Sequence, residues 1–138
     1  MVLSVVMSLV WIGLQSNPFV GHWISVYDAT GKEKSEISLY LENGKLYGKV
    51  ERLLLPEDQG KRCVECKGAD KNRPIEGLVI VQGLEKEKQS WTDGTILDPA
   101  NGKRYSCTIS LNADGTLNVR GYLGFSILGR TQVWKPLK

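Results

Sequence analysis

The chain has 138 residues, of which 41% are hydrophobic, and this is enough for one domain with its own core. Eighteen basic and fifteen acidic residues leave a net charge of +3. Because the basic residues are spread along the chain and mixed with acidic ones, the charge gives no argument for a nucleic-acid partner.

The first sixteen residues, MVLSVVMSLVWIGLQS, contain no charged side chain. Their apolar run from Val2 to Leu14 is shorter than the about 20 residues that a helix needs to cross a bilayer. Such a run is typical of the apolar core of a secretory signal, although no basic residue follows Met1. We therefore expect a signal-like segment at 1–16, a mature domain at 17–138 without a stable membrane span, and export to the periplasm or the medium. A helix packed on the domain is the alternative for residues 1–16.

After residue 17 the chain shows short strands and turns, with no helical periodicity. The first strands are expected at 22–28 and 34–41, and a third ends near Leu53. Asn43-Gly44 is a strong signal for a two-residue hairpin and sets the register of the second and third strands. It predicts three pairs on one face and Tyr40 opposite Tyr47 on the other: Leu41 with Leu46, Leu39 with Gly48, and Ile37 with Val50.

A connection of about twenty residues, LLPEDQGKRCVECKGADKNRP, follows the third strand. Loops of this length in compact domains are usually functional or disordered, so it is either a lid or a plain surface loop. Further strands are expected at 76–83 and 91–97, near Lys103, and at 130–135. The turn NADG predicts a second hairpin with three facing pairs: Leu111 with Leu117, Ile109 with Val119, and Cys107 with Gly121.

Eight sequential antiparallel strands favour an all-β fold, an up-and-down barrel, whose interior is either filled or holds one small ligand. The expected apolar wall consists of Trp23, Leu39, Val50, Ile80, Trp91, Tyr105, Ile109 and Val119. Gly48 and Gly121 on the inner faces withhold bulk, and Tyr27 and Tyr105 supply polar anchors. No arginine or lysine falls on the registered inner faces. An anionic head group would therefore lie at the mouth, near Lys61, Arg62 or Lys67.

Three cysteines allow one disulfide and one remaining thiol in an oxidising compartment. Because Cys107 is on the predicted inner face, we favour a Cys66–Cys107 bridge over a Cys63–Cys66 bridge. The Cys63-Val64-Glu65-Cys66 spacing also suggests a thiol redox protein, but its flanks read as loop rather than as the start of a helix. A zinc site would need these cysteines together with the distant His22, so no metal is expected.

Several motifs resemble a known family: NPFVGHW, NGKLYGKV, CKGADKNRPIEGL, ILDPANGKRYSC and VRGYLGFSILGRTQVW. The Gly21-His22-Trp23 stretch resembles the opening signature of lipocalins. The whole set is similar to a family of small exported bacterial proteins filed as a domain of unknown function. This resemblance implies a lipocalin-like (calycin) barrel and export, and it implies no activity. It also implies that Arg130 lies across Trp23 as a structural plug at one end of the barrel, where a guanidinium stacks on an indole.

A single histidine and the absence of paired carboxylates or a Ser-His pattern leave little catalytic equipment, so we expect no enzyme and no cofactor. The favoured function is an exported binding protein that holds a small apolar or amphipathic ligand, such as a fatty acid or lipid fragment. A barrel that binds a protein partner through its surface is the alternative, and a redox protein is the third interpretation. The oligomeric state stays open.

Overall fold

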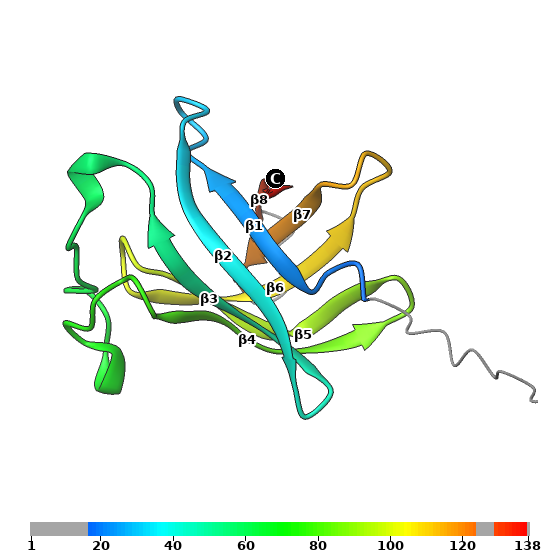
Figure 1. Ribbon diagram of the computed structural model, residues 1–138. Helices are drawn as coiled ribbons and strands as arrows, with labels where there is room; N and C mark the ends of the chain where they lie inside the picture. Colours follow the sequence, from blue (N-terminus) through cyan, green and yellow to red (C-terminus); the bar gives the residue numbers. More distant parts are fainter. Residues whose placement is uncertain (1–16, 124–128, 138) are drawn as a thin grey trace, which may run out of the picture.

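The computed structural model describes residues 17–123 and 129–137 (Figure 1). Within these residues the chain forms one closed antiparallel barrel, in which each strand pairs with its sequence neighbours and β8 closes on β1. The fold expected from the sequence is therefore confirmed, while the signal-like segment 1–16 lies outside the described residues. The strands are β1 (Gly21–Val26), β2 (Glu33–Glu42), β3 (Lys45–Leu53), β4 (Val79–Glu87), β5 (Ser90–Asp98), β6 (Lys103–Leu111), β7 (Leu117–Tyr122) and β8 (Arg130–Pro136).

Two short 3₁₀ turns interrupt the connection between β3 and β4: η1 (Pro56–Asp58) and η2 (Gly68–Asp70). Across the described ranges, the chain has no helix with the length and apolar character that crossing a membrane requires. We call residues 54–78 the strap. Figure 1 shows the strap, in green, at the same end of the barrel as the β5–β6 turn, in yellow.

Both predicted hairpin registers are confirmed. Asn43 and Gly44 have φ values of 52° and 77°, as a two-residue turn with two left-handed residues requires. The pairs across β2 and β3 and across β6 and β7 are those expected from the two turns. Tyr40 and Tyr47 stack on the other face, with ring centroids 5.9 Å apart. The correct register buries most of each apolar set inside the barrel, whereas Leu41 and Leu111, next to the two turns, stay exposed.

The fourth strand differs most from its prediction, because β4 runs from Val79 to Glu87 rather than from 76 to 83. Gly77 belongs to the strap, and its N–H donates to the Val50 carbonyl oxygen over 2.7 Å. Gly83 does not end the strand. It takes φ of 68° inside β4, a conformation that glycine adopts without steric cost, and the strand continues past it.

One end of the barrel is filled by side chains. The rings of Phe19 and Trp91 meet edge to face at 6.4 Å, and Trp23 Nε1 donates to the Phe19 carbonyl oxygen over 2.9 Å. The remaining space at this level is occupied by buried aliphatic residues from five strands: Leu39, Leu46, Leu84, Ile109 and Leu117. This end is also the one where the chain enters β1, so residues 17–20 help to close it.

The prediction that Arg130 plugs the barrel against Trp23 is wrong. Trp23 pairs with Pro136 at the far end of β8, six residues from Arg130, which is roughly 20 Å at about 3.3 Å per residue. The Arg130 side chain is 64% exposed, and its Nε donates to Asp28 Oδ2 over 2.7 Å. The two residues therefore lie at opposite ends of the barrel.

Candidate ligand-binding site

A cavity of about 600 Å³ occupies the other end of the barrel. It is bounded by the ends of β1, β3, β5 and β7, by the strap residue Ile75, and by the β5–β6 turn. The cavity is lined by five of the nine residues that the sequence predicted to contact a ligand: Tyr27, Val50, Ile80, Tyr105 and Val119. The volume lies within the range of about 300–1,000 Å³ that is usual for small-molecule sites.

The other four residues of the predicted ligand wall do not line the cavity. Trp23, Leu39, Trp91 and Ile109 are buried in the filled end, where they contact other side chains. Their inward orientation follows from strand alternation, but alternation says nothing about depth along the barrel axis. The prediction that all nine residues share one cavity is therefore wrong.

Gly121 leaves space in the cavity and Gly48 does not. A Cβ added at Gly121 would lie 3.5 Å from Ile96 Cγ2 and from Tyr105 Cβ, which is ordinary contact. A Cβ added at Gly48 would lie 2.9 Å from Leu39 Cδ2 and 3.0 Å from Val81 Cβ, which is too close. Gly48 thus permits tight packing in the filled end, whereas Gly121 contributes open volume.

Two basic residues, Lys34 and Arg130, line the cavity. This corrects the expectation that no lysine or arginine faces inward and that Lys61, Arg62 and Lys67 are the nearest cations. The register of β1 and β2 shifts between Ser25 and Val26, and this irregularity alters which side chains face the interior near Lys34. Lys34 Nζ lies 4.9 Å from the centre of the Tyr27 ring, a cation–π distance.

Tyr27 joins the barrel to the strap. Its hydroxyl donates to Asp58 Oδ2 over 2.7 Å, and Lys61 Nζ donates to Asp58 Oδ1 over 2.7 Å. Burial, together with the hydrogen bond to Asp58, raises the pKa of Tyr27 to about 12. The hydrogen bond from Lys61 holds the pKa of Asp58 below its ordinary value. Tyr27 therefore stays neutral at physiological pH, with its oxygen still able to accept a hydrogen bond from a ligand.

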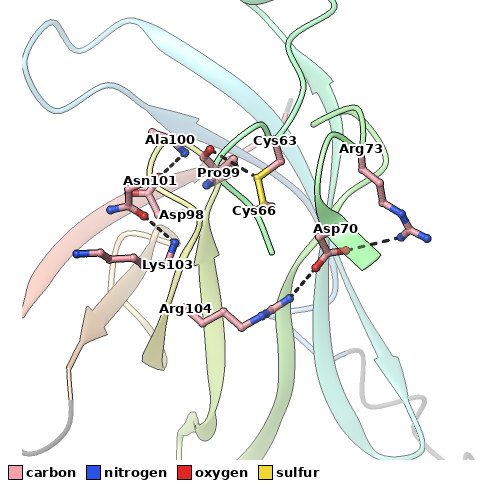
Figure 2. The surroundings of a disulfide bond; sticks show 10 residues. All are labelled: Cys63, Cys66, Asp70, Arg73, Asp98, Pro99, Ala100, Asn101, Lys103 and Arg104. Atoms are coloured by element: carbon pink, nitrogen blue, oxygen red, sulfur yellow. Dashed lines mark hydrogen bonds and ion pairs between the residues drawn. A yellow bond between two sulfur atoms is a disulfide. The ribbon is translucent and has the colours of Figure 1, made fainter. Parts of the chain in front are cut away.

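The far side of the strap is fixed to the β5–β6 turn and to the start of β6 (Figure 2). Asp70 Oδ2 lies 3.2 Å from Arg104 Nη2, and Cys63 Sγ lies 3.6 Å from the Pro99 carbonyl oxygen. Gly102 has φ of 71° and no room for a Cβ, which would collide with the Glu65 carbonyl oxygen. The strap is thus a pinned cover at one side of the cavity rather than a free loop.

The disulfide joins Cys63 to Cys66, and Cys107 is a free, buried thiol. The predicted Cys66–Cys107 bridge is therefore wrong. Cys107 lies four residues along β6 from Lys103, about 13 Å inside the barrel, whereas the other two cysteines lie against the turn at its mouth. Burial raises the pKa of the Cys107 thiol to about 12, so it is not a reactive thiolate at neutral pH.

His22 contacts Glu36 rather than the cysteines. Its Nδ1 lies 3.0 Å from Glu36 Oε2, and Arg52 donates to the other oxygen of the same carboxylate. The hydrogen bond from Arg52 lowers the pKa of Glu36. Within residues 17–123 and 129–137, no three acidic, histidine or cysteine side chains are grouped as a metal site requires.

Comparison with known proteins agrees with the barrel. The family described as "uncharacterized protein conserved in bacteria (DUF2147)" matches residues 21–136. A solved structure of protein HP1028 from the human pathogen Helicobacter pylori, described as belonging to the lipocalin family, is 24% identical. The matched region covers 87% of this chain and 83% of the HP1028 chain, with a TM-score of 0.74. No curated protein matches the chain. The likeness to HP1028 shows a lipocalin-like fold, and the family match over nearly the whole barrel shows that this chain belongs to the bacterial family DUF2147.

Proposed function

We propose that this protein binds one small amphipathic molecule in the cavity at the open end of the barrel. The observation that carries the proposal is the division of the barrel interior. One end is packed with aromatic and aliphatic side chains, while the other encloses about 600 Å³ bordered by apolar walls and a few polar groups. A barrel that acted only through its surface would have no reason to keep this volume open, because empty apolar space lowers stability.

Binding is supported over catalysis by the groups at the cavity. The Tyr27 and Tyr105 hydroxyls already have partners in Asp58 and Asn101, so they are placed to orient a ligand rather than to move a proton. Thiol redox chemistry is disfavoured because the Cys63–Cys66 disulfide is buried from reaction partners, and because burial raises the pKa of the Cys107 thiol.

Export is part of the same proposal. It is supported by the uncharged apolar residues 1–16 and by the disulfide, since disulfides persist mainly in oxidising compartments. In a bacterium this points to the periplasm or the medium. The mass of the mature chain from fractionated cells would test it, with cleavage near residue 16 expected.

The proposal is tested by native mass spectrometry of the protein purified from the exported fraction without organic solvent. We expect a species heavier than the chain by one small molecule, which dissociates when the protein is acid-unfolded. The result against the proposal is a mass equal to the bare chain in every preparation, with no uptake of added fatty-acid or sterol-acid probes. The surface-partner interpretation would then replace it.

A further inference from the structure

The polar and the apolar residues of the cavity lining come from two different sets of strands. In an eight-stranded barrel β8 and β1 lie opposite β4 and β5. Most lining residues from β8, from β1 with the residue after it, and from β2 are polar: Ser25, Tyr27, Lys34, Ser35, Arg130 and Gln132. The apolar exceptions on these strands are the buried Ile37 and Trp134. The lining residues from β3 to β5 and from the strap are apolar apart from one: Val50, Leu53, Ile75, Ile80, Ile96 and Leu97. The exception is Asp98 at the end of β5, whose Oδ1 accepts a hydrogen bond from the Ala100 N–H in the turn.

The polar wall has hydrogen-bonding capacity beyond what its own contacts use. The Ser25 and Ser35 hydroxyl oxygens are 2.6 Å apart, which uses one of their two hydrogens. Gln132 Oε1 accepts from Trp134 Nε1 over 3.3 Å, which leaves the two hydrogens of its amide nitrogen for another partner. Tyr27 donates to Asp58 and keeps an acceptor, while Lys34 adds a positive charge.

Such a wall is costly to cover with an apolar surface. Ser25 and Ser35 are buried, so an acyl chain laid against them would leave the remaining hydroxyl hydrogen of the pair without a partner. The same chain would strip water from the half-buried Gln132 amide without replacing its hydrogen bonds. A fatty acid with its carboxylate at Lys34 would pair with the charge at the cavity mouth but would offer no hydrogen-bond partner to this wall. A molecule with oxygens along one face would both pair with Lys34 and form hydrogen bonds with the wall.

We infer that the ligand is amphipathic across its width: a rigid hydroxylated polycyclic acid, of the sterol-acid kind. It turns its hydroxyl and carboxylate oxygens toward β8, β1 and β2 and its apolar face toward β3 to β5. This inference rests on the proposed function and specifies the ligand class for the same cavity. Ser25, Ser35 and Gln132 are then the residues that select a hydroxylated ligand over a linear one.

Calorimetric titration of the purified protein with three probes tests the inference. The probes are cholate, which carries three hydroxyls on one face, cholanate, which has the same skeleton and carboxylate without them, and palmitate, each kept below its micelle-forming concentration. We expect cholate to bind about tenfold more tightly than either of the others. The Gln132→Leu variant and the Ser25→Ala/Ser35→Ala double variant should each weaken cholate about fivefold to tenfold and should not weaken palmitate.

Thr108→Val is the matched control, because Thr108 shares a similar hydroxyl pair with Thr92, at 2.9 Å, away from the cavity lining. It should change neither affinity. The inference is overturned if palmitate binds as tightly as cholate, or if the wall variants bind cholate like the unmodified protein. The ligand would then be a linear molecule with a polar head and an apolar tail. If no probe binds and none co-purifies, the proposed function itself fails.

Discussion

Gly48 and Gly121 both sit on the inner faces of strands, yet they predict opposite responses to the same substitution. Gly48→Ala forces a methyl group to within 3.0 Å of Val81 Cβ, which is attached to the backbone and cannot turn away. We expect a loss of about 1–3 kcal/mol in the free energy of unfolding. Gly121→Ala places its methyl at ordinary contact distance and should stay within about 0.5 kcal/mol of the unmodified protein.

Urea unfolding of the two variants measures this difference. Each is the other's control, because both replace a strand glycine with alanine at a position where φ is not positive. Equal losses for the two variants would contradict the assignment of Gly48 to the packed end and Gly121 to the cavity.

At the residue scale, the sequence predicted which side chains face inward better than what they touch. The facing pairs in the two hairpins were correct because tight turns set the register. The pairing of the cysteines and the position of Arg130 were not predictable in the same way. Both depend on how far along the barrel axis a residue lies, and this depends on the accumulated stagger of all strands.

At the scale of the elements, the contribution of the strap contacts at Asp58 to the free energy of unfolding should depend on pH. Asp58→Ala leaves the Tyr27 hydroxyl and Lys61 without their acceptor, and we expect a loss of about 1–3 kcal/mol at neutral pH. The pKa of Asp58 is lowered, so the stability contributed by its carboxylate is present above the unfolded-state pKa and is lost as the pH falls through the folded-state pKa. The difference between variant and unmodified protein should therefore shrink in acid.

Unfolding at pH 7 and at about pH 2.5 checks the sign of this dependence. Asp114→Ala is the control, because its carboxylate also has a lowered pKa, through bonds from Thr116, but lies in an exposed turn away from the strap. A stability difference for Asp58→Ala that is the same at both pH values would show that its carboxylate does not hold the strap to β1.

The strap was also the element least accessible to sequence reasoning. Its length predicted a loop with a role, but nothing in the sequence places Ile75 in the cavity wall or Glu65 over Gly102. These contacts form between segments far apart in the chain. The register shift between Ser25 and Val26 is a further local irregularity. It lies next to Lys34, which lines the cavity although strand alternation predicted that it faces outward.

At the scale of the whole molecule, a closed barrel of eight strands followed directly from the count and spacing of the turns. The location of the open volume did not. Trp23 and Trp91 were expected to line a ligand site, but together with Phe19 they close one end and so confine the cavity to the other. Whether an inward side chain fills space or borders it is a property of the assembled packing, not of the pattern along any one strand.

The most direct test of a ligand-binding cavity is titration of the protein with a fluorescent fatty-acid analogue, compared with a variant whose cavity is blocked. Gly121→Leu directs a branched side chain into the cavity beside Ile96 and Tyr105, while Ala113→Leu adds the same side chain to an exposed turn at the other end. We expect saturation at one probe per chain, an affinity at least about tenfold lower for Gly121→Leu, and no change for Ala113→Leu. Probe binding that does not saturate, or that is equal in all three proteins, would contradict the account.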